Sequence, residues 1–222
     1  MIKSFKFELT RDFIESGKLE EYASEYEALG YFRRSSQAER EQSRNAMLSH
    51  YEPGEDVWLF AYGSLIWNPM IEFSEQRSGI VHGYHRRFCM WTMVGRGTPD
   101  CPGLVLGLVG GGSCTGVAFR IPAELAEREL TLIWNREMLS DSYIAKIVSM
   151  KTDAGPVRAI AFAMNTDNDR YTGRLADEQL AAVISKAEGP LGPCRDYLIN
   201  TVEKMSEFGL SDSHLSKLVK LI

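Results

Sequence analysis

The residue best placed to do chemistry is a glutamate at the end of an apolar row on a helix. The segment that follows Pro122 reads AELAERELTLIWNREML, residues 123–139, and the proline suits the first turn of a helix. At about 100° per residue, Glu137 falls within roughly 20° of the centre of an apolar stripe. The stripe consists of Ala126, Leu130, Ile133 and Trp134.

A carboxylate in such a position is costly to bury unless it is paired, and its usual response is a raised pKa. A carboxyl group of raised pKa can move protons near neutral pH. The alternative is that the helix rotates or frays at this point, so that Glu137 pairs with Arg136 or another cation at the surface. The spacing alone leaves both interpretations open.

The second candidate is the stretch FAYGSLIW, residues 60–67, in which an apolar strand breaks on Gly63 and Ser64. Glycine at a strand end permits unusual backbone angles and lets a ligand reach the peptide N–H groups. Successive N–H groups in such a turn form a shallow nest for anions, which would suit a carboxylate or a polarised carbonyl. The alternative is an ordinary turn at the end of a strand.

Other reactive residue types show no spacing typical of a site. Ser64 is not part of a GxSxG motif, and the four histidines show no HExxH motif or other metal-ligand spacing. The four cysteines form no CxxC pair, so we expect packing residues in a reducing compartment. A serine hydrolase or a zinc enzyme is therefore disfavoured, and no metal ligand is predicted.

Two further patterns are given structural roles. Arg86 and Arg87 lie on an alternating strand, so one should face inward and the other outward. The run GLVGGGS, residues 107–113, lacks the spacing and the lysine of a phosphate loop, so its glycines are predicted to form a hairpin turn.

The elements that must position these residues are of both kinds. Glycine-punctuated strand-like runs cover 57–62, 79–92, 103–110 and 114–121, and KTDAGP separates two more, 143–150 and 157–164, as in a hairpin. Helical segments follow at 176–189, 194–209 and 211–222. Strands and helices do not alternate regularly, so the fold class is α+β with a small antiparallel sheet or barrel.

The first 55 residues form a polar, helical lead-in. Helices are predicted within 11–30 and 35–51, the second capped by Ser35 or Ser36. The chain therefore divides into an N-terminal helical extension, 1–55, and a second part, 56–222.

Bulk composition excludes several classes of protein. The 222 residues are 44% hydrophobic and 25% charged with a net charge of −5, which argues against disorder and against a nucleic-acid binder that needs a positive field. The start of the chain has no apolar stretch long enough for a signal peptide or a membrane span. We therefore expect a cytoplasmic protein without nucleic-acid or membrane partners.

Several separated motifs, taken in order, resemble the ChaC family of γ-glutamylcyclotransferases, which act on glutathione. They are VWLFAYGSLIWNP (57–69), GYHRRFCMWT (83–92), RGTPDCPGLVLGL (96–108), GVAFRI (116–121), WNREM (134–138) and AEGPLGPCRDYLINT (187–201). The resemblance implies the cyclotransferase fold, a small mixed or antiparallel β-barrel flanked by helices. The helical lead-in is similar to that of longer bacterial members.

The resemblance also implies roles for individual residues. Glu137 becomes the catalytic acid and base, and the strand end at 59–65 binds the γ-glutamyl group through Leu59, Phe60, Ala61, Tyr62, Gly63, Ser64 and Leu65. Shorter members have a tyrosine soon after this glutamate, preceded by two glycines. Here EMLSDSY supplies Tyr143 at a longer spacing and without those glycines, and Tyr143 is taken as a substrate-binding residue on this resemblance.

The implied reaction makes few demands on the protein. The α-amine of a γ-glutamyl peptide attacks its own side-chain carbonyl, closes a five-membered ring and expels the peptide amine, giving 5-oxoproline. With glutathione the other product is cysteinyl-glycine. Because the substrate supplies the nucleophile, no enzyme nucleophile, metal or organic cofactor is required.

Two alternatives remain open at this stage. The same fold could act on other γ-glutamyl amines or peptides, or it could be a non-catalytic binding or regulatory module linked to cation transport. The N-terminal helices could recruit a partner in either case. The oligomeric state is left undetermined by the sequence.

Overall fold

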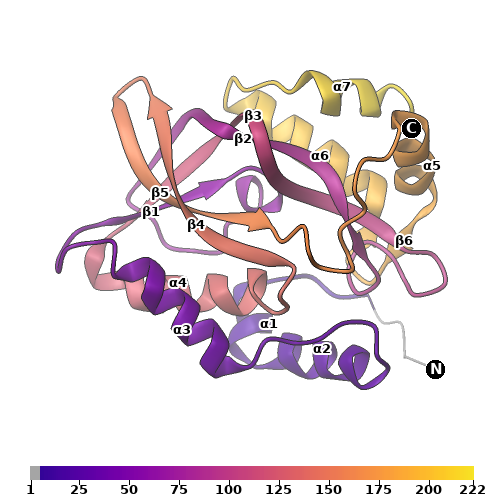
Figure 1. Cartoon of the computed structure of the whole chain (residues 1–222), viewed down its shortest axis with the longest axis horizontal. Coiled ribbons are helices and arrows are strands. Elements are labelled where there is room, and N and C mark those ends of the chain that lie inside the picture. Colours follow the sequence, from indigo (N-terminus) through magenta and orange to yellow (C-terminus); the bar gives the residue numbers. More distant parts are fainter. Residues whose placement is uncertain (1–5) are drawn as a thin grey trace.

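Runs rich in valine, leucine, isoleucine and aromatic residues form a closed β-barrel in the computed structural model, which describes residues 6–222. The strand order is β1-β3-β2-β4-β5, and β5 closes the barrel by pairing in parallel with β1 and β3 (Figure 1). The predicted small mixed barrel flanked by helices is confirmed. The strands are β1 (Val57–Ala61), β2 (Glu75–Thr92), β3 (Gly103–Ile121), β4 (Tyr143–Thr152) and β5 (Gly155–Met164).

The long hairpin of β2 and β3 corrects one prediction. The glycine run at 110–113 does not form a hairpin turn, because it lies inside β3, which continues through both predicted strands. The pairing register shifts between His82 and Tyr84, opposite Gly111 and Gly112, whose φ angles are +95° and +73°. These glycines therefore form a bulge that bends a continuous strand, and the chain reverses earlier, in the segment 93–102.

Helix α4 (Ala123–Glu137) packs its predicted apolar stripe into the core. The ring of Trp134 meets that of Phe162 on β5 edge to face, with centroids 5.1 Å apart. All four stripe residues are buried, which fixes the rotation of the helix about its axis. Glu137, the last residue of α4, is therefore presented in a fixed direction.

The N-terminal helices are α1 (Arg11–Glu15), α2 (Lys18–Ala28) and α3 (Gln37–Leu48). Ser36 caps α3 in a reciprocal capping box with Glu39, as one of the two predicted caps. Gly17, at φ +79°, separates α1 from α2, so the segment 11–30 holds two helices. The first five residues of the predicted extension lie outside the described part of the chain.

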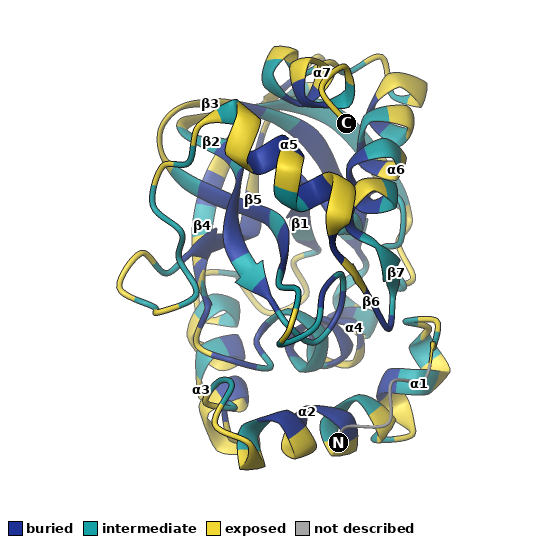
Figure 2. Ribbon diagram, turned by 90° about the vertical axis from the view of Figure 1, so that its right-hand side faces the viewer, coloured by how far each residue is buried: buried dark blue, intermediate teal, exposed yellow. Residues whose placement is uncertain are grey.

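An ion pair between a partly exposed arginine and a buried glutamate links this extension to the rest of the molecule. Arg11 of α1 donates two hydrogen bonds to the fully buried carboxylate of Glu129 on α4, at 2.7 and 3.1 Å. The extension lies along one end of the barrel, opposite the C-terminal helices (Figures 1 and 2). The division into 1–55 and 56–222 remains a prediction, since α1 and α3 both pack on α4.

The C-terminal segment covers another side of the barrel. It comprises α5 (Asp177–Lys186), the short strands β6 (Glu188–Gly189) and β7 (Gly192–Pro193), α6 (Cys194–Glu207) and α7 (Ser213–Val219). Helix α6 packs against the 3-10 turn η1 (Ser64–Ile66), which follows β1. The C-terminal helices therefore reach the turn that the sequence singles out.

In the described part of the chain, no helix is both long and apolar enough to cross a membrane. The cysteines are free thiols, and Cys89, Cys114 and Cys194 are buried. Their predicted role as packing residues is confirmed for these three.

Candidate functional site

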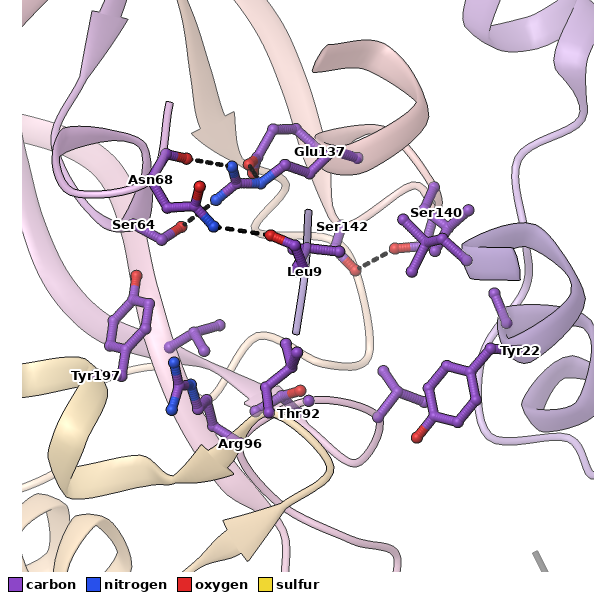
Figure 3. A pocket seen from close by; sticks show the side chains of 18 of the residues that line it. Leu9, Tyr22, Ser64, Asn68, Thr92, Arg96, Glu137, Ser140, Ser142 and Tyr197 are labelled. Carbon is purple, nitrogen blue, oxygen red and sulfur yellow. Dashed lines mark hydrogen bonds and ion pairs between the residues drawn. The ribbon is translucent and has the colours of Figure 1, made fainter. Parts of the chain in front are cut away.

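A cavity of about 630 Å³ lies between the barrel and the N-terminal extension. Residues from distant parts of the chain line it: Leu9, Tyr22 and Phe32 from the extension, Ser64 from η1, Glu137 from α4, Tyr143 from β4 and Tyr197 from α6 (Figure 3). Cavities of this size are typical of small-molecule sites. Three of the predicted site residues, Ser64, Glu137 and Tyr143, are thus brought together.

Glu137 combines burial with a single charged partner. Its side chain is 15% exposed, and Oε1 lies 2.8 Å from Nε of Arg136, whose side chain is only 4% exposed. Burial raises the pKa of the Glu137 carboxyl, and the Arg136 cation partly opposes that rise. The alternative interpretation, a pair with Arg136 at the surface, named the correct partner. The pair is not at the surface, however, because both side chains are buried beside the cavity.

Arg136 also fixes the turn after β1. Its Nη2 donates to Ser64 Oγ at 3.0 Å, and its Nη1 donates to the carbonyl oxygen of Asn68 (Figure 3). One buried guanidinium thereby joins the carboxylate on α4 to the turn at the end of β1. The distance between the two predicted halves of the site is set by a rigid planar group.

Gly63 is required because a side chain of the protein itself, that of Tyr197, approaches it closely. A Cβ atom built at this position would lie 2.8 Å from the hydroxyl oxygen of Tyr197, which is closer than real contacts allow. The φ angle of Gly63 is −136°, so the left-handed region is not the reason for glycine here. The side-chain hydroxyl of Tyr197 occupies the space that the glycine leaves.

The anion nest predicted in this turn is smaller than expected. The N–H group of Ile66 donates to the Gly63 carbonyl, and those of Trp67 and Asn68 donate to the Ser64 carbonyl. The Ser64 N–H donates to the Tyr197 hydroxyl oxygen, so a nest can be built only from the N–H groups of Gly63 and Leu65. The Ser64 hydroxyl accepts from Arg136, so its own proton can be donated to a ligand.

The other predicted residues of the strand end do not present side chains to the cavity. The side chains of Leu59, Phe60, Ala61 and Leu65 are buried in the core, and Tyr62 donates its hydroxyl to the Phe162 carbonyl at 2.6 Å. These side chains pack beneath the turn, on the side that faces the core. Any contact that they make with a ligand comes from main-chain atoms.

Arg86 supports the same turn, as the inward-facing member of the predicted arginine pair. Its guanidinium donates to the Tyr62 carbonyl at 2.7 Å and pairs with Asp212 at 2.9 Å. Its side chain is 1% exposed, whereas Arg87 is only half-buried, which confirms the predicted alternation. The buried cation therefore anchors the end of β1 to the segment before α7.

Two tyrosines complete the reactive end of the cavity. Tyr143 donates its hydroxyl to the Leu106 carbonyl at 2.8 Å, and burial raises its pKa well above the ordinary value. Burial raises the pKa of Tyr197 to about 12. Both hydroxyls therefore keep their protons at neutral pH and cannot act there as bases.

Sequence reasoning missed Tyr197 and the positioning role of Arg136. Tyr197 lies within the motif 187–201, but nothing in the spacing of that motif indicates contact with Gly63. Arg136 was considered only as a surface partner. Among residues 6–222, no group of three or more His, Cys, Asp or Glu side chains is arranged to hold a metal ion.

A family model described as ChaC-like protein matches residues 57–222. The chain belongs to this family. The family expected from the sequence motifs is thereby confirmed, and the match contains Glu137, Tyr143, Tyr197 and the whole turn after β1. The ChaC-like part begins at Val57, the first residue of β1, so the cavity residues of the N-terminal extension lie outside it.

Named relatives of this ChaC-like chain are similar over about three quarters of its length. It is 41% identical over 164 residues to the glutathione-specific γ-glutamylcyclotransferase of Escherichia coli K12, covering 73% of this chain and 71% of the relative. Identity is 34% over 175 residues to γ-glutamylcyclotransferase 2-3 of Arabidopsis thaliana, covering 75% and 88%. It is 31% over 173 residues to glutathione-specific γ-glutamylcyclotransferase 1 of Homo sapiens, covering 75% and 78%.

A solved structure shares the fold. The crystal structure of a yeast γ-glutamyl cyclotransferase specific to glutathione matches with a TM-score of 0.68 at 21% identity, covering 75% of this chain and 97% of the yeast chain. The ChaC-like barrel described above is therefore the fold of that enzyme.

Proposed function

We propose that this chain is a γ-glutamylcyclotransferase that cleaves glutathione to 5-oxoproline and cysteinyl-glycine. The observation that carries the proposal is the buried Glu137 carboxylate, joined by Arg136 to the turn at Ser64 beside one cavity. Relatives with 41% and 31% identity are named glutathione-specific γ-glutamylcyclotransferases, which supports the choice of substrate.

The reaction needs one group that first takes and then returns a proton. The substrate α-amine attacks the side-chain carbonyl carbon, a new C–N bond closes the ring, and the original amide C–N bond breaks. In the proposed mechanism the Glu137 carboxylate accepts a proton from the attacking nitrogen and delivers one to the leaving nitrogen. Its pKa is raised toward neutral pH, the range in which one carboxyl group can both accept and return a proton.

The turn after β1 holds the γ-glutamyl arm in a folded shape. The Ser64 hydroxyl and the N–H groups of Gly63 and Leu65 are the donors that can bind it or stabilise the oxygen on which charge develops. Because the nucleophile and the carbonyl belong to one molecule, holding them together replaces a bimolecular encounter, which can supply several kcal/mol of the barrier. Tyr143 and Tyr197 enclose this end as neutral groups.

A substrate panel tests this proposal. Purified protein is incubated with glutathione, γ-glutamyl-alanine and γ-glutamyl-lysine, and 5-oxoproline is followed by mass spectrometry. We expect the tripeptide to be preferred. Preference for a dipeptide would favour a cyclotransferase for other γ-glutamyl compounds, and binding of glutathione by calorimetry without release of cysteinyl-glycine would favour a non-catalytic module.

The same proposal includes the cellular compartment of the reaction and the part of the chain that performs it. Glutathione is a small soluble molecule, and we propose that the protein meets it in the cytoplasm. The part from residue 56 onward would be the catalytic unit, and the helical extension 1–55 would cover it.

A further inference from the structure

Four arginines line the cavity, and Arg170 is one that its surroundings leave without a counterion. Arg170 follows β5, its Nε donates to the Trp91 carbonyl at 2.9 Å, and its Nη1 donates to Ser140 Oγ at 3.3 Å. Its guanidinium carbon lies 5.6 Å from the centroid of the Phe32 ring. These contacts fix the guanidinium but leave donors free, because arginine has five.

No described carboxylate forms an ion pair with Arg170. Asp141 is the acidic residue that acts on it, yet Asp141 is exposed and accepts a hydrogen bond from Asn168. Burial lowers the pKa of Arg170 from its ordinary value, which is the effect of an uncompensated cation in a water-poor site. By contrast, Arg11 and Arg136 in the same cavity are each paired with a glutamate, whereas Arg96 also forms no ion pair among the described residues.

The cavity has two ends with different surroundings (Figure 3). Ser64 and Tyr197 lie on one side of the cavity, together with Arg96, whose guanidinium is 5.8 Å from the Trp67 ring. Ser140, to which Arg170 donates, lies at the other end, near Tyr22 of the extension.

A γ-glutamyl peptide such as glutathione also has two ends, each with a carboxylate. One carboxylate belongs to the γ-glutamyl residue and stays close to the reacting amine, which must lie near Glu137. The other belongs to the last residue of the leaving peptide. Two residues of extended chain separate the reacting amide from that carboxylate, a reach of roughly 7 Å. A leaving peptide that extends away from Ser64 would carry it to the end of the cavity that holds Ser140 and Arg170.

We propose that Arg170, held beneath Phe32 of the N-terminal extension, binds the terminal carboxylate of the leaving peptide and thereby selects peptides that end in a free carboxylate there. This inference rests on the proposed function and adds a specificity residue to it. The extension supplies the support, because the Ser35 N–H donates to the Leu139 carbonyl at 2.9 Å and Arg34 forms an isolated β-bridge with Ser140. The extension therefore shapes substrate choice although it precedes the family match.

The test compares glutathione with its C-terminal amide, γ-glutamyl-cysteinyl-glycinamide, which differs only in the charge of that end. We expect the wild type to have a kcat/KM for glutathione on the order of 10- to 100-fold above that for the amide, as for a charge-assisted hydrogen bond. Most of the difference should appear in KM. In Arg170→Met the KM for glutathione should rise until the preference is lost, and Arg170→Lys should restore part of it.

The amide serves as the control for folding. If Arg170→Met turns over the amide as the wild type does and has lost its preference for glutathione, the inference is supported. Arg174→Met, an exposed arginine four residues away, should keep the wild-type preference. Equal kcat/KM for the two substrates in the wild type, or an undiminished preference in Arg170→Met, would overturn the inference while 5-oxoproline release still supports the proposed function. A wild type that releases no 5-oxoproline from either substrate would overturn both.

Discussion

The tight contact between Gly63 and Tyr197 gives a prediction that the structure makes quantitative. In Gly63→Ala the new methyl group would lie 2.8 Å from the Tyr197 hydroxyl, whereas ordinary contacts begin at 3.4 Å, so one partner must move by about 0.6 Å. Tyr197 cannot yield easily, because its ring packs edge to face against Trp67 at 6.1 Å and Phe88 at 5.9 Å. Overpacking of this kind costs about 1–3 kcal/mol of unfolding free energy.

The displaced group is part of the reactive end of the cavity, so activity should fall as well. A shift of the turn by a fraction of an ångström should lower kcat/KM for 5-oxoproline release by about 10- to 100-fold. Unfolding in urea gives the stability. The matched control is Gly110→Ala, where an added Cβ meets nothing within 4 Å and stability should change by less than about 0.5 kcal/mol.

A double-mutant cycle separates the clash from other effects. Tyr197→Phe alone should cost about 1 kcal/mol for the lost hydroxyl, but it also removes the atom that the Gly63→Ala methyl meets. The double variant should therefore be about 1–2 kcal/mol more stable than the sum of the single effects indicates. Additivity within about 0.5 kcal/mol would show that the hydroxyl is not what requires glycine at this position.

Three further predictions concern charged groups. The kcat/KM should fall at acid pH as Glu137 is protonated, through a pKa above the ordinary 4.5 of glutamate. Arg136→Met should move this fall to higher pH, because the cation that opposes the rise in the Glu137 pKa is lost. A pH profile that does not shift in Arg136→Met would contradict this reasoning. Burial alone would raise the pKa of Glu129, but hydrogen bonds led by Arg11 lower it overall, so its stabilising contribution is present above pH 4.5 and is lost as pH falls through the folded pKa. Glu129→Gln should therefore cost about 1–3 kcal/mol in urea unfolding at pH 7 and less at pH 3, and a pH-independent cost would refute this. Arg86→Met should cost about 3–5 kcal/mol by leaving a carboxylate and buried carbonyls unpaired, and chemical denaturation showing less than 1 kcal/mol would refute that.

Local patterns in the sequence predicted the elements that build the site. The spacing from Ala126 to Trp134 placed the buried stripe of α4 and hence Glu137, and Ser36, one of the two candidates for a single cap, caps α3. Alternation along β2 predicted that one of Arg86 and Arg87 faces inward. Each of these features depends only on residues close together in the sequence, within a few turns of a helix or one strand. Periodic patterns in the sequence can therefore predict them.

Features that depend on distant contacts were not predictable from these patterns. The glycine run at 110–113 resembles a hairpin turn, but its pairing with β2 decides that it is a bulge. Tyr197 lies 134 residues after Gly63, and no periodicity relates them. The helical lead-in gave no sign that Phe32 would stand over Arg170 in the cavity, because that contact exists only once the extension docks through Arg11.

The most direct test of the central claim is the release of 5-oxoproline by Glu137→Gln compared with the wild type. The substitution keeps the size and polarity of the side chain and removes its basicity, and Glu124→Gln, at an exposed position on the same helix, is the matched control. With glutathione as substrate and mass spectrometry as readout, the wild type and the control should release 5-oxoproline and cysteinyl-glycine in equal amounts. Glu137→Gln should be slower by about 100-fold or more. A folded Glu137→Gln variant that works at a near-normal rate would contradict the account.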